Sequence, residues 1–539
     1  MGMKWILGLL VFVTFSGFAQ SESDDQSVDF EVLKNLELFE LVYKNIDINY
    51  VDQPDPGALM KAAIDAMLRE LDPYTNYIPE SLIEDYKLMT TGQYGGIGAI
   101  IQQIEGRVAI IDPHLNFPAQ KAGLRAGDLF LEIDGRSVEE LSYDEISEKL
   151  KGKPGSEIVI KVERGDQQIE KTLVREEVKL SSVPYHGMVN EEIGYIKFTS
   201  FTRDVSTEIL EAFANLKSQG MNKLIFDLRG NGGGLLIEAV KIVNFFVSKG
   251  SPIVSIKGRK EEDNRGYTAA LKPLDTEIPI VVLIDGGSAS ASEIVSGALQ
   301  DLDRAVILGE TSFGKGLVQR PLDLKYNARV KVTIAKYYTP SGRCIQKLDY
   351  SNRKVGNDAA AISDSLITTF KTMNGREVID GRGVEPDVNV DLLDMSRLTI
   401  TLLTENILFN YATKYRNEHE QISDVRDFRL SDADYEDFKQ FVLKQEFDYS
   451  TASYEKMEEL RKVAENEDFF HEGSEEFDQL MKKFEPSKER DLEKFKKELS
   501  LILEDEIVGR YYFAKGRIEH GLAVDNYILK AVEILNDIP

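Results

Sequence analysis

The segment VVLIDGGSASASEI, residues 281–294, decides how the rest of the chain is interpreted. Four apolar residues typical of a buried strand lead into a glycine turn, and a run of small residues then begins a helix. A serine at this junction lies beside unpaired backbone N–H groups and the positive end of the helix dipole. Such groups stabilise the oxyanion that forms when a serine attacks an amide. The segment therefore predicts an α/β layer that carries a candidate nucleophile.

Three serines compete for that role: Ser288, Ser290 and Ser292. The order Ser290-Ala291-Ser292-Glu293 also fits a capping box, in which Ser290 would only cap the helix. The local sequence leaves both interpretations open.

A serine hydroxyl needs a base, and none of the five histidines falls in or near this segment. A lysine can serve where burial disfavours its charged form. Lys315 stands in GETSFGKGLVQ, residues 309–319, which follows the next apolar strand. The same stretch fits part of a phosphate-binding loop, but Gly316 replaces the Ser or Thr that would hold magnesium. We therefore expect Lys315 to serve a serine and not a nucleotide.

Apolar strands are also expected at residues 223–228, 278–284 and 304–308, with a helix after each of the first two. Alternating strands and helices are typical of an α/β layered core. Residues 227–234, DLRGNGGG, follow the first strand. They fail as a dinucleotide-binding fingerprint because Leu235 stands where the third glycine should be.

The sequence pattern of residues 92–177 differs from this and predicts short strands, tight turns and one short helix. Their order resembles a PDZ domain. That resemblance implies a carboxylate-binding loop whose backbone N–H groups face a peptide's terminal carboxylate, while the next strand accepts the peptide as an added strand. The loop would comprise Tyr94, Gly95, Gly96, Ile97 and Gly98. The alternative is a small β-domain whose glycines only make turns.

Composition and the amino terminus restrict the compartment and the partners. A formal net charge of −27 disfavours nucleic acid, which requires clustered Lys and Arg. Residues 1–19 read as a secretory signal, with Lys4 before an apolar run that is too short to span a bilayer. We expect an exported protein, most simply periplasmic, with no stable membrane span after signal cleavage. Cys344 is the only cysteine, so the chain cannot form an internal disulfide.

The segments GSASASEI, residues 287–294, and GKGLVQ, residues 314–319, resemble the carboxyl-terminal processing (tail-specific) proteases. The resemblance implies Ser290 as nucleophile, Lys315 as general base and Gln319 as a residue that holds the lysine. It also implies an oxyanion hole built from the Ala291 amide and the amide of Gly233 or Gly234. On an extended segment Gln319 would share a face with Lys315. No metal and no cofactor is implied.

The expected protein is a multi-domain α/β chain with a PDZ-like β-domain inserted before the protease core. The expected parts are a signal peptide (1–19), an N-terminal helical region (20–91), a PDZ domain (92–179), a serine protease α/β core (180–395) and a C-terminal helical extension (396–539). The extension lies outside the resemblance, and its helices, like those near the amino terminus, are compatible with a homo-oligomer.

The predicted function is a secreted serine endopeptidase that cleaves proteins near their C-termini. Its partners would be proteins or peptides with free C-termini, which the PDZ domain recognises. Two alternatives stay open: a non-catalytic PDZ scaffold that binds tails, and a serine hydrolase acting on another substrate such as an ester.

Overall fold

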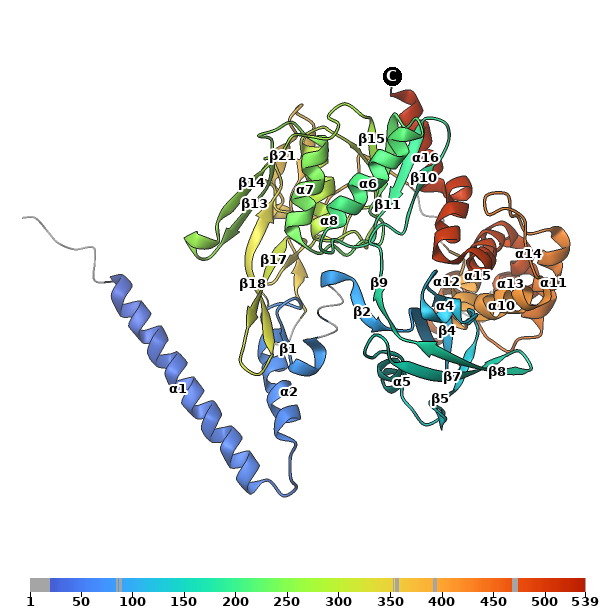
Figure 1. Cartoon of the computed structure of the whole chain (residues 1–539), viewed down its shortest axis with the longest axis horizontal. Helices are drawn as coiled ribbons and strands as arrows, with labels where there is room; N and C mark the ends of the chain where they lie inside the picture. Colours follow the sequence, from blue (N-terminus) through green and yellow to red (C-terminus); the bar gives the residue numbers. More distant parts are fainter. Residues whose placement is uncertain are drawn as a thin grey trace, which may run out of the picture. The chain divides into compact units, whose positions relative to one another are not determined.

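The structure is a computed structural model of the 539-residue chain (Figure 1). It divides into two compact units, Met1–Tyr77 and Ile78–Pro539. The expected signal peptide lies outside the described residues. These are 20–83, 86, 90–351, 353, 358–390, 395–467 and 474–538.

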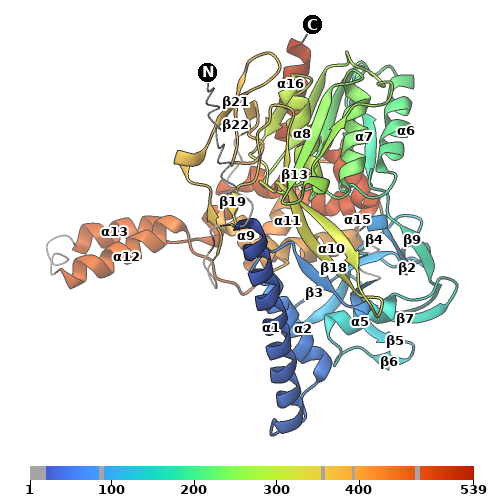
Figure 2. The same ribbon diagram turned by 90° about the vertical axis from the view of Figure 1, so that its left-hand side faces the viewer.

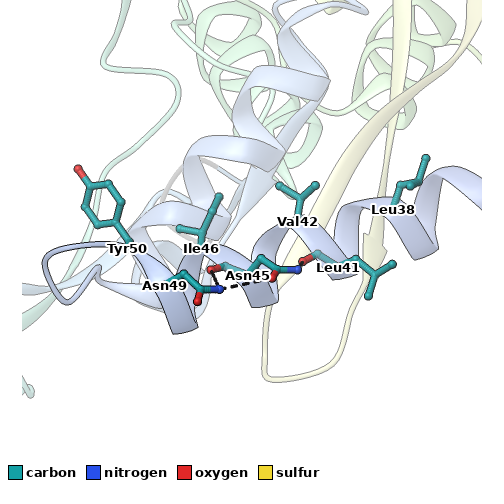
Figure 3. A pocket seen from close by; sticks show the side chains of 7 residues that line it. All are labelled: Leu38, Leu41, Val42, Asn45, Ile46, Asn49 and Tyr50. Carbon is teal, nitrogen blue, oxygen red and sulfur yellow. Dashed lines mark hydrogen bonds between the residues drawn. The ribbon is translucent and has the colours of Figure 1, made fainter.

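The first unit contains helices α1 (Gln20–Asn49) and α2 (Pro56–Arg69). The carboxylate of Asp55 caps α2 by accepting from the N–H groups of Gly57 and Ala58 at 2.8 and 3.0 Å. Along its carboxyl-terminal half, α1 carries a shallow, mostly apolar hollow (Figure 3). The side chains that line the hollow are Leu38, Leu41, Val42, Asn45, Ile46, Asn49 and Tyr50.

The expected PDZ domain is a sheet in the order β3-β4-β5-β7-β8, with the short β6 pairing β5. Its apolar core includes Ile110, Phe130 and Ile160. A separate pair, β2 with β9, leads into and out of the domain. The elements are β2 (Gln93–Gly96), β3 (Ala99–Ile104), β4 (Arg107–Pro113), α4 (Pro118–Lys121), β5 (Leu129–Ile133), β6 (Arg136–Ser137), α5 (Tyr143–Leu150), β7 (Glu157–Arg164), β8 (Gln167–Val174) and β9 (Glu176–Lys179).

The expected protease core is built on a six-stranded sheet in the order β10-β11-β12-β15-β16-β23. All neighbours are parallel except β10, which is antiparallel to β11. The predicted α/β layer and its strands are therefore confirmed. Strands and helices of this layer are β10 (Tyr185–Met188), β11 (Ile193–Lys197), α6 (Val205–Ser218), β12 (Lys223–Asp227), α7 (Leu236–Phe246), β15 (Ile280–Ile284), α8 (Ala291–Asp301), β16 (Val306–Gly309) and β23 (Val388–Asn389).

The central strands are apolar on both faces because helices cover both. On one face, Phe226, Val282 and Ile284 pack against α6, α7 and α8, which lie together in Figure 1. On the other face, Ile225 and Leu283 pack against residues from the end of the chain. The near-continuous apolar runs that predicted these strands follow from this two-sided burial.

A second sheet, which the sequence did not predict, lies beside the α/β layer in the protease core. Strand β18 pairs antiparallel with both β17 and β13, and β13 pairs with β14. These strands are half-exposed and polar on one side, so they lack the apolar runs that marked the first sheet. Their bounds are β13 (Pro252–Gly258), β14 (Arg265–Thr268), β17 (Leu317–Asp323) and β18 (Arg329–Tyr338).

Short elements complete the part of the chain before the C-terminal helices. They are β1 (Asn76–Ile78), η1 (Glu80–Leu82), η2 (Glu261–Asp263), β19 (Leu348–Asp349), β20 (Ala360–Ala361), η3 (Asp364–Leu366), β21 (Thr369–Lys371) and β22 (Glu377–Ile379).

The C-terminal region is helical, as predicted, and has an apolar core of its own that includes Leu402, Phe438 and Leu503. Figure 2 shows α12 and α13 projecting as a hairpin from the other helices. Among the described residues, no helix is both long and apolar enough to cross a bilayer. The helices are α9 (Arg397–Thr404), α10 (Ile407–Glu418), α11 (Asp432–Leu443), α12 (Ala452–Asn466), α13 (Ser474–Phe484), α14 (Lys488–Lys494), α15 (Lys496–Val524) and α16 (Asn526–Asp537).

The last helix, α16, is part of the protease core and not a free extension. Ile528, Ala531 and Leu535 are fully buried against the sheet residues Ile225 and Leu283. The chain therefore returns from the helical region to cover the second face of the core sheet. Local sequence could not predict this, because the contact joins residues about 250–300 positions apart.

This packing predicts that α16 stabilises the whole core. We expect Leu535→Ala to lower the free energy of unfolding by about 2–5 kcal/mol, the usual cost of truncating a buried leucine. Leu529→Ala, on the exposed side of the same helix, should change it by no more than about 0.5 kcal/mol. Urea denaturation of the two variants measures the difference. Equal losses would show that α16 does not pack on the sheet as described.

Candidate active site

Ser290 stands where β15 has ended and α8 begins. Its backbone has φ 55° and ψ −109°, which is an unusual conformation for a residue other than glycine. The side chain lines a cavity of about 480 Å³. The same cavity is lined by the other residues predicted for the site, namely Gly233, Gly234, Ala291, Lys315 and Gln319. Three separate segments of the chain, around residues 233–234, 290–291 and 315–319, thus contribute these residues to one site.

The structure distinguishes the three serines that the sequence left in competition. Ser288 is fully buried and donates from its hydroxyl to the carbonyl oxygen of Leu228 at 2.9 Å. Ser292 is fully buried and donates to the carbonyl oxygen of Asn231 at 2.8 Å. Only Ser290 of the three lines the cavity. Buried hydroxyls with backbone acceptors stabilise the turn, whereas Ser290 is accessible to a substrate.

Lys315 lies in the loop between β16 and β17 and is half-buried at the cavity wall. Its backbone N–H donates to Glu293 Oε2 at 2.9 Å. Gln319 lies on β17 itself and donates from Nε2 to Thr333 Oγ1 at 3.2 Å. The β17–β18 pairing shifts register between Val318 and Gln319. Lys315 and Gln319 therefore do not share a strand face, because Lys315 is in a loop and Gln319 follows a bulge in β17. Both side chains still line the same cavity.

The two candidate oxyanion glycines differ in their surroundings. The N–H of Gly233 donates to Asn231 Oδ1 at 3.0 Å, and Gly233 is buried. A Cβ on Gly233, which has φ +97°, would lie 2.6 Å from the Ala289 carbonyl oxygen and 2.8 Å from Ser290 Cβ. Only glycine allows this close approach. The N–H of Gly234 has no hydrogen-bond partner among the described residues, and Gly234 is exposed at the cavity.

Glu293, which the sequence suggested only as half of a capping box, is a fully buried carboxylate that contacts both the Ser290 turn and the Lys315 loop. It accepts hydrogen bonds from Ser290 N (2.7 Å), Lys315 N (2.9 Å), Gly314 N (2.7 Å) and Ser312 Oγ (2.6 Å). Burial raises the pKa of this carboxyl, and the accepted hydrogen bonds offset the shift only in part. The capping pattern in the sequence revealed Glu293 as the partner of Ser290, but not its bonds to the lysine loop.

Residues at the start of α16 contact two loops of the site, the glycine loop and the loop before Lys315. Asp227, at the end of β12, is fully buried; although burial alone would raise its pKa, the charges of Arg229 and Lys197 lower it to about 2. Arg229 also pairs with Asp525 at 2.8 Å, at the start of α16. On the same helix the hydroxyl of Tyr527 donates to Glu310 at 2.6 Å, in the loop that leads to Lys315. The role left open for the final helices therefore includes holding two loops of the site.

A second cavity, of about 240 Å³, lies in the PDZ domain between β3 and α5. Its wall includes Tyr94 and Ile97 from the predicted carboxylate-binding loop, and Ile101 and Leu150 from the strand and the helix. Burial is the main cause that raises the pKa of Tyr94 to about 12. Gly98 has φ +71°, and a Cβ there would lie 2.4 Å from Phe117 Cβ, so the loop requires glycine at this position. Gly95 and Gly96 are in strand β2 and are not among the residues that line this cavity.

Known sequence families cover most of the second unit. The profile of "Peptidase family S41" matches residues 192–359. A "PDZ domain" profile matches residues 112–164, and "Probable PDZ-protease, C-terminal helical domain" matches residues 398–535.

Two sequence relatives agree with these profiles. A "Carboxy-terminal-processing protease" of Bartonella bacilliformis is 36% identical over 342 residues, which cover 62% of this chain and 78% of the relative. A "Probable CtpA-like serine protease" of Staphylococcus aureus is 35% identical over 313 residues, which cover 58% of this chain and 62% of the relative. A solved structure, the "photosystem II D1 C-terminal processing protease", is 28% identical, with a TM-score of 0.35, and the match covers 65% of this chain and 86% of that one.

The sequence motifs, the α/β core with its PDZ domain and the identity to a curated protease over most of that protease's length all agree. The chain belongs to peptidase family S41 and is a serine peptidase of the carboxy-terminal-processing type, with a PDZ domain and a C-terminal helical domain.

Proposed function

We propose that this chain is an exported endopeptidase that captures the free C-terminus of a protein in its PDZ domain and cleaves near that end with a Ser290–Lys315 dyad. The observation that carries the proposal is the single cavity lined by Ser290, Lys315, Gln319, Ala291 and the glycine loop. Proteins and peptides with free C-termini are its substrates.

In this mechanism the neutral amine of Lys315 accepts the proton of the Ser290 hydroxyl as Oγ attacks the carbonyl carbon of the scissile amide. The N–H groups of Ala291 and Gly234 donate to the resulting oxyanion, and the unpaired state of the Gly234 amide favours it over Gly233. The lysine ammonium then gives its proton to the leaving amine. Water, activated in turn by Lys315, hydrolyses the acyl-enzyme and frees Ser290.

Gln319 is assigned a supporting role in this proposal. Its amide nitrogen donates to Thr333, so its carbonyl oxygen is left as an acceptor that can hold the lysine amine towards Ser290.

The PDZ cavity supports capture of a tail with an apolar last residue, because its wall is largely aliphatic and aromatic. Amidating the terminal carboxylate of a substrate removes the charge that the Tyr94–Gly98 loop would bind. We expect weaker capture by about 1–3 kcal/mol, seen as a higher KM at nearly constant kcat. The matched substrate is the same polypeptide with a free carboxylate. Equal KM values for the two would remove the proposed role of the PDZ domain without affecting the dyad.

Export is proposed from residues 1–19, where a basic residue, an apolar run and a small-residue cleavage site follow one another. We propose the periplasm as the compartment of the mature chain. Amino-terminal sequencing of the protein isolated from the cell envelope should then begin at Gln20. An intact Met1 in the mature protein would contradict signal cleavage.

A further inference from the structure

The two residues of the proposed dyad are far apart in the sequence, so the covalent chain alone does not fix the distance between them. Ser290 ends the turn before α8, and Lys315 lies in the loop before β17, 25 positions later. A general base works only within hydrogen-bond reach of its proton, about 2.6–3.2 Å. Contacts between the two segments must therefore set their separation.

Tyr337, near the end of β18, makes such a contact. Its single hydroxyl proton is shared between two acceptors, the carbonyl oxygen of Ser290 at 3.0 Å and the carbonyl oxygen of Lys315. The residue is only 1% exposed, and its ring belongs to the apolar core of the protease domain. One rigidly packed phenol thus bridges the backbones of both residues.

The bond to Ser290 has a further consequence for the oxyanion hole. The Ser290 carbonyl and the Ala291 N–H belong to one planar peptide, in which the two groups point in opposite directions. A donor that holds the carbonyl oxygen therefore sets the direction of the Ala291 N–H, and Ala291 lines the cavity. This orientation must be imposed, because Ser290 adopts φ 55°, which is unfavourable for serine.

The lysine peptide is held in the same way. The Lys315 carbonyl accepts from Tyr337, and the N–H at the other end of that peptide, on Gly316, donates to Gln346 Oε1 at 2.8 Å. On the opposite side, the buried Glu293 carboxylate accepts from the backbone N–H groups of both Ser290 and Lys315. Tyr337 binds both carbonyls, and Glu293 binds both amides.

We propose that Tyr337 and Glu293 form a positioning clamp that sets the separation of Ser290 and Lys315 and aims the Ala291 N–H at the oxyanion. The inference rests on the proposed roles of Ser290 and Lys315. Tyr337 also lines the cavity, but neither clamp residue transfers a proton in this proposal; both act through the backbones of Ser290 and Lys315.

The test is the kinetics of Tyr337→Phe in the full chain, with an internally quenched polypeptide that ends in a free apolar residue. The ring and its packing are kept, and only the bridging hydroxyl is lost. We expect kcat to fall about 10- to 100-fold, the scale of a misplaced catalytic group or a weakened oxyanion donor, while KM stays nearly unchanged. Because a smaller folded fraction would also lower the apparent kcat at unchanged KM, kcat is expressed per folded molecule, with the folded fraction measured by circular dichroism on the same samples.

The matched control is Tyr435→Phe, which removes another buried hydroxyl that donates to a backbone carbonyl, that of Leu492 at 2.6 Å, in the helical domain. It should lose similar thermal stability and keep kcat. A wild-type kcat for Tyr337→Phe, or an equal kcat loss in Tyr435→Phe, would overturn the clamp.

Should Tyr337→Phe fail to fold, Glu293→Gln tests the other side of the clamp. Its amide offers one acceptor oxygen where the carboxylate offers two, so we expect the same selective loss of kcat. An unchanged kcat in folded Glu293→Gln would overturn the proposal. Failure of the dyad itself is separate and visible, because Ser290→Ala would then remain active.

Discussion

Ser290→Ala is expected to lower kcat/KM for polypeptide cleavage by about 10⁴-fold or more, the scale of losing a nucleophile in a serine peptidase. Folding should survive, because the hydroxyl of Ser290 is at the cavity and the turn is held by its neighbours. Steady-state cleavage of a quenched polypeptide, with thermal unfolding measured in parallel, separates loss of activity from loss of structure.

The neighbouring serines provide matched controls. Ser288→Ala and Ser292→Ala each remove a buried hydroxyl that donates to a backbone carbonyl. We expect each to cost about 1 kcal/mol of stability and to leave most of the activity. If Ser288→Ala or Ser292→Ala were inactive while Ser290→Ala stayed active, the nucleophile would be that other serine and not Ser290.

Lys315→Arg is expected to be nearly as inactive as Lys315→Ala, with a loss of about 10³-fold or more in kcat. A guanidinium stays protonated at any working pH and cannot accept the serine proton, although it keeps the positive charge.

Lys347→Arg is the control for this substitution. Lys347 is exposed, does not line the cavity, and lies on the segment whose backbone pairs with Gly314. It should keep full activity. Near-normal turnover of Lys315→Arg would mean that the residue supplies only charge and that the base lies elsewhere.

The α/β layer could be predicted because its strands are buried on both faces and therefore stand out as apolar runs, as at Ile280–Ile284. The second sheet could not, because β17 and β18 are half-exposed and carry no such run. The packing of α16 was equally hidden. An amphipathic helix shows that it has an apolar face, but not which distant sheet the face will cover.

In the candidate site, too, some residues could be predicted from the sequence and others could not. Ser290, Lys315 and the glycine loop belong to short motifs, and the resemblance of those motifs to a protease family selected Ser290 from three serines that the local sequence left open. The bonds of Glu293 to Lys315 and of Tyr337 to Ser290 and Lys315 join segments that meet only in the folded chain. Nothing in the sequence around Tyr337 indicated contact with the site.

The most direct test of the central claim is mass spectrometry of the products from one exported polypeptide with a free apolar C-terminus. The chain should release fragments cut near that end, Ser288→Ala should release the same fragments, and Ser290→Ala should release none. Identical fragments at a wild-type rate from Ser290→Ala would contradict the assignment of this cavity as the place where the protein cleaves its substrates.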